Sequence, residues 1–456
     1  MRSLGIASAL VLCLAPPIRA DSPVSAIGAF AFTVFVDSSA LVIPYDGNQL
    51  LTDPHPQVLR AVVLIPGSNR NSSFGYETLL ECATIAGMND STSLLVVPQY
   101  LIEEDIAHFQ LPADHPFWSD DGWKEGNRSQ SSSSHPRPVR ISSFAVLDSA
   151  LYAIASRNPN LESIVVAGHS AGGQFVNRYA AGNAVEPALW DSFGVQVSYV
   201  SANPSSYLYL DGERPVRGVP GSFGVPDPVS CPDYDQYKYG MQSRNLYMAT
   251  LPDTQIVRQF AQRRVTYLLG QLDTDPAHPD LDTTCPAELQ GVHRLERGIL
   301  YHDFLSHYYG ADIWAVHSTV VVPGVGHDSR GMLTSPCGVV ALFGAGSCTA
   351  VDVKDWPGAT GDANERGWLR CAPDPFRTRT TILFGLPAGV RRATVGVYDL
   401  RGRRLRTLES GAPRDGRGSV VWDGRGGSGQ RLPAGIYLLR LGDGRTAITK
   451  RVALLR

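Results

Sequence analysis

Length, composition and charge already bound what this chain can be. Its 456 residues exceed one ordinary domain, and a hydrophobic content of 43% is enough to fill a large core. A formal net charge of −3 excludes the strongly basic balance of a nucleic-acid-binding protein.

The N-terminus is typical of a secretory signal peptide. Arg2 supplies a positive charge, residues 4–15 form an apolar stretch, and Ile18-Arg19-Ala20 precedes a polar start. The apolar stretch is too short to span a bilayer comfortably, and no later segment reaches transmembrane length. We therefore expect residues 1–20 to be removed and the mature protein to be secreted or held at the cell surface.

Eight short apolar runs predict the strands of one sheet. Continuous apolar strands are buried on both faces, which favours a parallel sheet between layers of helices. The expected strands are residues 30–36, 41–43, 61–65, 94–97, 164–167, 195–200, 265–269 and 319–322, and the expected helices are residues 76–86, 141–155, 172–181 and 254–263. The alternation predicts an α/β fold over residues 21–352, with a mostly parallel eight-stranded sheet and helices on both faces.

Two long insertions and a C-terminal module complete the organisation. The insertions, residues 205–251 and 275–314, follow strand ends at the edge of the sheet where α/β folds bind ligands, and we expect them to form a cap. Residues 353–370 are predicted to be a linker. Residues 371–456 carry 17 Lys and Arg against 6 Asp and Glu, and their short strands separated by Gly-rich turns predict a small β-sandwich.

The cysteine count permits disulfides. Six cysteines remain after removal of the signal peptide, which allows up to three bridges in an exported chain. Cys337 with Cys348 is the local pair that we expect first, and Cys231 with Cys285 is the second. No Cys-x-x-Cys pattern or compact His/Cys cluster indicates a metal site, and we expect no cofactor.

The segment Gly168-His169-Ser170-Ala171-Gly172 is the strongest chemical signal. It follows an apolar run and precedes a helical pattern, so Ser170 is expected on a tight turn where its hydroxyl is accessible. A serine nucleophile needs a base, a carboxylate to orient that base, and donors for the oxyanion. The alternative is one more tight turn in a chain with 45 glycines.

Two later segments supply the missing groups. Gly270-Gln271-Leu272-Asp273 and Gly324-Val325-Gly326-His327 each follow a predicted strand, and the order Ser, Asp, His matches one known triad arrangement. Asp275 is a rival for the acid, Asp273 is otherwise a turn residue, and His327 is otherwise a buried structural histidine. The strand positions favour Ser170, Asp273 and His327 as a catalytic triad.

The loop after the third strand is the expected source of oxyanion donors. We expect the backbone N–H groups of Ala171 and Ser68 to form the oxyanion hole. Asn69 and Arg70 are candidates for orienting the loop or touching substrate. His169, next to the nucleophile, is the third candidate substrate contact, with a structural role as the alternative.

The sequences GHSAGG, LLGQLD and VPGVGHD, each after a strand, resemble those of α/β-hydrolases over residues 29–345. The loop IPGSNRNSSFGYE is similar to the His-Gly loop of secreted polyester and feruloyl esterases, with Pro66 where many members have His. The resemblance implies a Ser-His-Asp esterase that acts through an acyl-enzyme on a small-molecule or polymer ester. A peptidase or amidase on the same fold, and a non-catalytic binding protein on a hydrolase scaffold, remain open.

The C-terminal stretch also resembles a known module. The sequences VGVYDLRGRRLRTL, VVWDGR and AGIYLLRL are similar to the immunoglobulin-like domain of flagellar hook-capping proteins and to C-terminal sorting domains of type IX-like secretion substrates. Asp374 stands where Asn is usual. The resemblance implies a partner in the secretion machinery, and a plain stabilising sandwich is the alternative.

Overall fold

The structure, a computed structural model, describes residues 22–89, 91–217, 219, 221–350, 368–372, 375–385, 394–399, 402–409, 417–442 and 447–455. The predicted signal peptide and residues 353–367 of the predicted linker lie outside this part of the chain. By internal contacts the chain divides into two compact units. The first holds the residues up to Leu210, Gln236–Leu268 and His327–Cys348, and the second holds Asp211–Asp235, Leu269–Gly326 and the residues from Thr349 onwards.

The central sheet has eight strands, as the sequence predicts. Their order is β1-β2-β4-β3-β5-β6-β9-β10. The bounds are β1 Phe30–Val36, β2 Ser39–Gly47, β3 Arg60–Ile65, β4 Ser93–Pro98, β5 Ser163–His169, β6 Gln196–Ala202, β9 Arg264–Gly270 and β10 His317–Val322. β1 pairs antiparallel with β2, and so does β2 with β4, whereas β3, β4, β5, β6 and β9 pair in parallel. Every residue of β4 is buried, as expected for a strand covered on both faces.

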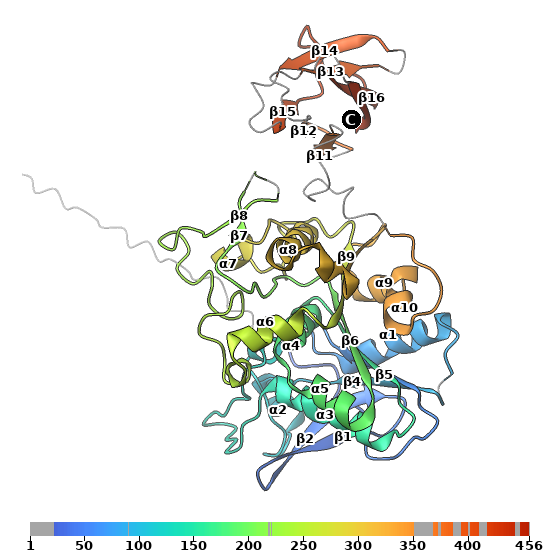
Figure 1. The fold of residues 1–456 in the computed structure, drawn as a ribbon, viewed down its shortest axis with the longest axis vertical. Coiled ribbons are helices and arrows are strands. Elements are labelled where there is room, and N and C mark those ends of the chain that lie inside the picture. Colours follow the sequence, from blue (N-terminus) through green and yellow to red (C-terminus); the bar gives the residue numbers. More distant parts are fainter. Residues whose placement is uncertain are drawn as a thin grey trace, which may run out of the picture. The chain divides into compact units, whose positions relative to one another are not determined.

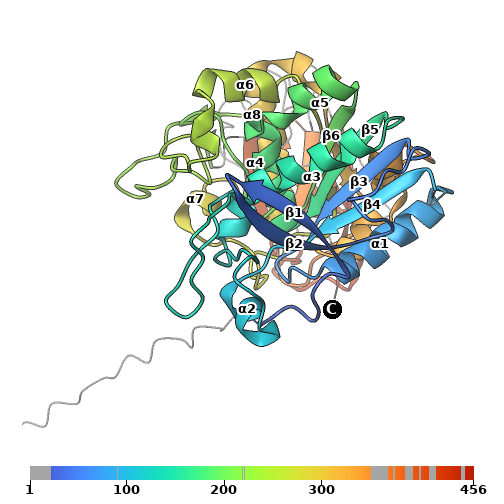
Figure 2. The ribbon, with the colours of Figure 1, turned by 90° about the horizontal axis from the view of Figure 1, so that it is seen from below.

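Helices cover both faces of this sheet (Figure 1). Figure 2 shows α1 on one face and α3, α4 and α5 on the other, and α9 and α10 pack beside α1. The helices are α1 Ser72–Ile85, α2 Glu103–Phe109, α3 Ser143–Arg157, α4 Ala171–Gly182, α5 Val185–Phe193, α6 Asp253–Phe260, α7 Cys285–Glu288, α8 Arg294–Tyr309, α9 Ser329–Leu333 and α10 Pro336–Phe343; the 3₁₀ turns are η1 Gly122–Glu125, η2 Met248–Thr250 and η3 Ala311–Ala315. This arrangement is the α/β-hydrolase fold.

Helix starts follow local capping chemistry. The Asn71 side chain accepts a hydrogen bond from the Phe74 N–H, and this cap starts α1 four residues before its predicted start. Ser142 caps α3 in the same way through the N–H of Phe144. The predicted helices are therefore present with shifted ends, while the sequence patterns do not predict α2, α5, α7, α8, α9 and α10.

The C-terminal domain is a sandwich of two antiparallel sheets. One sheet has the order β11-β12-β15 and the other β14-β13-β16-β17. The bounds are β11 Trp368–Ala372, β12 Thr380–Gly385, β13 Thr394–Tyr398, β14 Arg404–Glu409, β15 Arg417–Trp422, β16 Gly435–Gly442 and β17 Ala447–Leu454. Phe384, Trp422 and Leu439 are fully buried between the sheets. β11 begins at Trp368, three residues before the predicted domain start, because Trp368 already pairs with Gly385.

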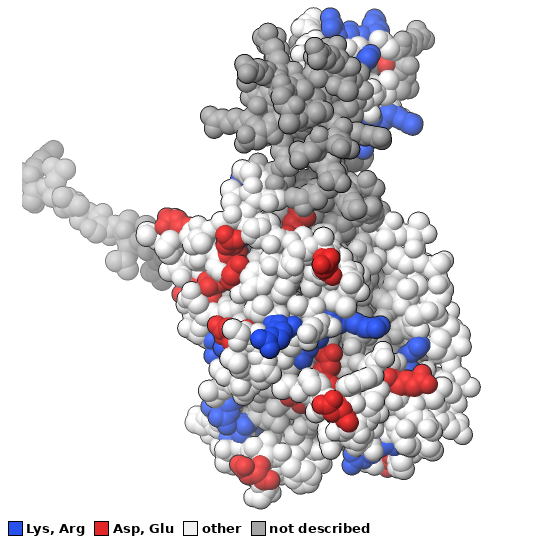
Figure 3. Space-filling model, in the orientation of Figure 1, with Lys and Arg blue, Asp and Glu red and all other residues white. Residues whose placement is uncertain are grey.

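Two surface findings bear on function. No helix in the described ranges is both long enough and apolar enough to cross a membrane. On the face drawn in Figure 3, acidic and basic side chains are interspersed among the described residues before 350.

Candidate active site

Ser170 lies on a sharp turn between β5 and α4. Its backbone has φ 57° and ψ −117°, a region that L-residues rarely occupy, at a cost on the order of 1–3 kcal/mol. The turn leaves little room, since a Cβ on Gly168 would lie 2.3 Å from the Gly172 oxygen and a Cβ on Gly172 2.2 Å from the Ile65 oxygen. The glycines therefore allow β5, β3 and α4 to meet around the serine.

The backbone hydrogen bonds hold this turn in place. The Ser170 N–H donates to the Ala202 carbonyl at 2.9 Å, and the Gln174 N–H donates to the Ser170 carbonyl at 3.0 Å. Ala171 opens α4 and is 3% exposed, so its N–H lies at the positive end of the helix next to the serine.

His327 contacts the serine. Its Nε2 lies 3.0 Å from Ser170 Oγ, within range for the hydroxyl to donate to an unprotonated imidazole nitrogen. The two residues are 157 positions apart, and His327 follows β10 in the short loop that the sequence predicts. A serine hydroxyl and an imidazole nitrogen at this distance have the mutual geometry that a nucleophile and a general base need in acyl transfer.

His169 supports the ring of His327. The two ring centroids lie 4.7 Å apart. His169 is 4% exposed, and its Nε2 lies 3.3 Å from Nδ2 of the fully buried Asn203. Because an amide Nδ2 can only donate, His169 Nε2 is the acceptor, which favours the neutral imidazole. These contacts favour the structural role for His169, and Asn203 is a residue that the sequence analysis missed.

The two candidate acids differ in their surroundings. Asp273 follows β9 and is 3% exposed, and its carbonyl accepts a hydrogen bond from the Leu295 N–H at 3.1 Å. Asp275 is exposed, and its carboxylate accepts from the Ala277 N–H in a local turn. A carboxylate that orients a histidine must be held in one place, so the burial favours Asp273.

Arg294 is a second residue missed from the sequence. Its side chain is fully buried, and Nη1 lies 3.7 Å from the Asp273 carboxylate. Burial lowers the pKa of the Arg294 guanidinium, while Asp273 acts to raise it. The nearby positive charge offsets part of the cost of burying the Asp273 carboxylate.

The loop from Pro66 to Asn71 connects β3 to α1, and it is here called the oxyanion loop after its predicted role. Arg70 has a positive φ of 53°, and its N–H donates to the Gly67 carbonyl at 2.9 Å, which closes a tight turn. The Arg70 side chain is 2% exposed and donates from Nη1 to the Ser68 carbonyl at 3.2 Å. Of the two roles considered for Arg70, these contacts favour orienting the loop, whereas Asn69 is exposed.

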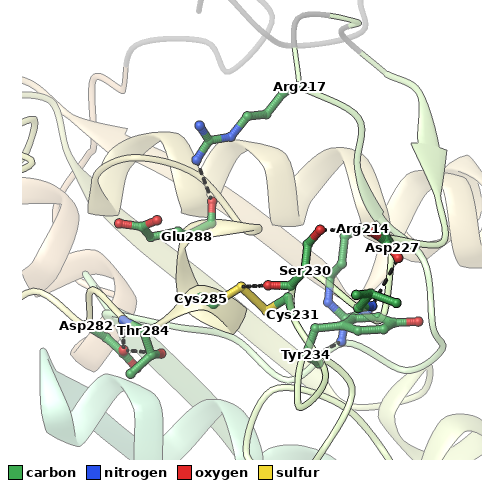
Figure 4. The surroundings of a disulfide bond; sticks show 11 residues. Arg214, Arg217, Asp227, Ser230, Cys231, Tyr234, Asp282, Thr284, Cys285 and Glu288 are labelled. Atoms are coloured by element: carbon green, nitrogen blue, oxygen red, sulfur yellow. Dashed lines mark hydrogen bonds between the residues drawn. A yellow bond between two sulfur atoms is a disulfide. The ribbon is translucent and has the colours of Figure 1, made fainter.

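The two insertions are linked by a disulfide. Cys231 and Cys285 are bonded, and Cys337 is bonded to Cys348, so both expected pairs are confirmed. Figure 4 shows the first bridge beside Ser230 and Tyr234, with Arg217 donating to the Glu288 carbonyl nearby.

Further contacts join the same two segments. His307 Nε2 lies 2.7 Å from the Glu213 carboxylate, and the His307 ring stacks on Phe223 with centroids 4.8 Å apart. Residues 211–235 and 269–326 therefore share one unit.

Comparison with known proteins finds one family model that matches part of the C-terminal domain. Residues 376–443 match the family model described as FlgD Ig-like domain. No curated protein matches the chain.

Solved structures similar to this chain include two bacterial hydrolases. One is poly(aspartic acid) hydrolase-1 from Sphingomonas sp. KT-1, at 22% identity and a TM-score of 0.42, over 68% of this chain and 96% of that one. Another is LpqC, a poly(3-hydroxybutyrate) depolymerase from Bordetella parapertussis, at 19% identity and a TM-score of 0.44, over 71% and 93%. A solved structure of another kind is PorZ, a surface component of the type IX secretion system of Porphyromonas gingivalis. It is similar at 27% identity and a TM-score of 0.15, over 19% of this chain and 11% of that one.

Proposed function

We propose that this protein is a serine hydrolase that cleaves esters. The observation that carries the proposal is the 3.0 Å approach of His327 Nε2 to Ser170 Oγ, with the serine on a strained turn between β5 and α4. A buried serine hydroxyl at hydrogen-bond distance from an imidazole is the pair that a nucleophile and its general base form.

The reaction proceeds in two halves. His327 Nε2 takes the Ser170 hydroxyl proton as Oγ attacks the acyl carbon, and the carbonyl electrons move to oxygen. The Ala171 and Ser68 N–H groups stabilise that oxyanion. The imidazolium then protonates the leaving oxygen, the alcohol departs and an acyl-Ser170 ester remains. Water attacks this ester by the same route in reverse, releasing the acid and restoring the serine.

Asp273 is proposed as the acid of the triad. Its burial, and its position directly after the strand that neighbours β10 in the sheet, support this role. In it, the carboxylate holds the His327 ring in one tautomer and stabilises the imidazolium. The residue is not expected to take up the proton itself.

The ester class and the cellular setting are further parts of the proposal. The likeness of the loop IPGSNRNSSFGYE to the loops of secreted esterases supports an ester substrate. The signal-peptide pattern, the two disulfides and the C-terminal immunoglobulin-like domain support export, with that domain acting as the sorting or surface-attachment module.

A fluorophosphonate probe tests the proposal directly. The wild type should be labelled on Ser170, and Ser170→Ala should not be labelled. An unlabelled wild type, or equal labelling of the variant, would overturn the serine-hydrolase function and leave the non-catalytic alternative. A panel of aryl esters of increasing acyl length, run beside peptide anilides, separates an esterase from a peptidase: faster turnover of anilides would overturn the ester class.

A further inference from the structure

The residues that follow the predicted signal peptide are tied to side chains around the oxyanion loop. Residues 22–29, here called the N-terminal strap, precede β1. Five of their backbone groups are hydrogen bonded to side chains elsewhere in the first unit, and the partners are Arg70, Asp105, Gln99 (twice) and Asp46. Most strap side chains are exposed, with Val24 the one that is buried. Polar contacts therefore contribute much of what holds the strap.

Arg70 joins the strap to the loop through one guanidinium. Its Nη2 donates to the Ser22 carbonyl at 3.2 Å, and its Nη1 donates to the Ser68 carbonyl, also at 3.2 Å. Because a guanidinium is rigid and planar, these two bonds are coupled in direction. A displaced strap would move the group that holds Ser68.

Gln99 makes a second connection of the same kind. Its Nε2 donates to the Ala26 carbonyl at 2.9 Å and lies 3.4 Å from the Arg70 carbonyl, while its Oε1 accepts from the Gly28 N–H at 3.0 Å. The side chain is 1% exposed. One buried amide thus contacts both the strap and the residue with positive φ in the oxyanion loop.

Asp105 contacts both the N-terminal strap and Arg70. Its carboxylate is fully buried and accepts from the Val24 N–H and the Ile102 N–H, each at 2.7 Å. The same carboxylate lies 3.6 Å from Arg70 Nε. Charge-assisted bonds of this kind are about twice as strong as neutral ones, so Asp105 fixes both the strap and the Arg70 side chain.

We propose that the N-terminal strap is a positioning element of the oxyanion hole, acting on Ser68 through Arg70 and Gln99. The inference rests on the proposed function. An oxyanion donor must lie about 2.7–3.1 Å from the developing charge, and the loop that carries Ser68 contains a residue in a strained backbone conformation. The strap and its partners hold that loop at the required place, so residues that never touch substrate control turnover.

Gln99→Glu is the sharpest test. It keeps the acceptor for the Gly28 N–H and replaces the donor to Ala26 and Arg70 with a carboxylate oxygen. Asn48→Asp is the matched control, since Asn48 also accepts from a backbone N–H, that of Leu95, and donates to a backbone carbonyl, that of Ser93. Ser93 begins β4, whereas Gln99 follows the other end of that strand.

We expect Gln99→Glu to lower kcat by roughly 10- to 100-fold with KM unchanged, as for a displaced catalytic group. Binding of an aryl trifluoromethyl ketone, which forms an oxyanion on Ser170, should weaken by the same factor. Arg70→Lys, which keeps the charge but loses the fork, should lie between the wild type and Gln99→Glu. Asn48→Asp should keep the wild-type kcat even if its unfolding midpoint falls as far as that of Gln99→Glu.

Two outcomes would overturn the inference, and they are distinct. If the wild type is labelled by the fluorophosphonate but folded Gln99→Glu keeps its kcat, or loses it no more than Asn48→Asp, the strap has no positioning role and the hydrolase function stands. If the wild type is not labelled at all, the proposed function fails and the positioning role fails with it. Asp105→Asn, which removes the charge facing Arg70, repeats the test and should show the same split between kcat and KM.

Discussion

The imidazole of His169 lies against that of His327, with their ring centroids 4.7 Å apart. His169 is held by its position at the end of β5 and by its contact with the Asn203 amide. Its ring therefore limits the movement of the His327 ring, which contacts Ser170. The dipeptide His169-Ser170 thus supplies both the proposed nucleophile and a ring that packs against its proposed base.

That relationship predicts a graded effect of substitutions at residue 169. His169→Phe keeps a flat ring against His327, whereas His169→Ala leaves a gap into which the base can turn. We expect kcat/KM to fall more for Ala than for Phe, measured with the best aryl ester of the panel. Equal values for the two variants would show that the ring contact has no part in holding His327.

Removal of either member of the contacting pair should abolish turnover. Ser170→Ala and His327→Ala are each expected to lower kcat by about 10⁴- to 10⁶-fold, and the double variant should be no worse, because the two groups act as a unit. The measurement is steady-state hydrolysis with unfolding curves as a control for folding. Losses that multiply in the double variant would contradict a shared role.

Substitution of the two aspartates separates the buried one from the exposed one. We expect Asp273→Asn to lower kcat by about 10⁴-fold, as loss of an orienting carboxylate does. Asp275→Asn should leave kcat unchanged, because Asp275 is exposed and bonds to its own turn. The assignment is wrong if the second variant is the inactive one.

Asp148 on α3 predicts a pH dependence of stability. Tyr179 and Tyr247 donate hydrogen bonds to its carboxylate at 2.7 and 2.8 Å, yet burial outweighs them and raises the pKa of Asp148 to about 6. Between about pH 3.8 and about pH 6, the Asp148 carboxyl of the folded protein therefore keeps its proton. The same carboxyl has released it in the unfolded chain, where its pKa is near 3.8.

It follows that the stability contributed by Asp148 is present below about pH 3.8 and is lost as the pH rises to about 6. Relative to Asp148→Asn, the wild-type free energy of unfolding should fall by about 3 kcal/mol over this range. Urea unfolding of both proteins at several pH values measures the difference. A difference that grows with rising pH would contradict the predicted direction.

The two disulfides are expected to contribute unequally. Cys231 and Cys285 are 54 residues apart and Cys337 and Cys348 only 11, and a longer loop loses more chain entropy when it is closed. Replacing each pair by serines should cost about 4 and about 3 kcal/mol respectively. Denaturant unfolding of the two double variants measures both losses of stability. A larger loss for the Cys337–Cys348 variant, which has the shorter loop, would contradict the prediction.

What the sequence determined by itself was the local framework of the site. The apolar run at residues 164–167 and the glycines around Ser170 predicted the strand, the turn and the helix, because burial on both faces and close backbone approach each leave a mark on neighbouring residues. The sheet, the sandwich and the pairing of Cys337 with Cys348 followed from patterns of the same local kind, whereas Cys231 and Cys285 lie 54 residues apart. The catalytic roles of Ser170, Asp273 and His327 stay predictions that the variants above test.

Only the tertiary structure decided which buried polar groups, far apart in the sequence, contact one another. Val24 and Asp105 are 81 residues apart, and no periodicity relates them. The sequence does not predict helix α8 for a related reason. Arg294 and Arg297 are buried in it, so charged residues occupy buried positions and interrupt the apolar periodicity by which a helix is recognised. Apolar burial repeats along the chain and can be read there, whereas the pairing of buried polar groups depends on where the whole fold brings them.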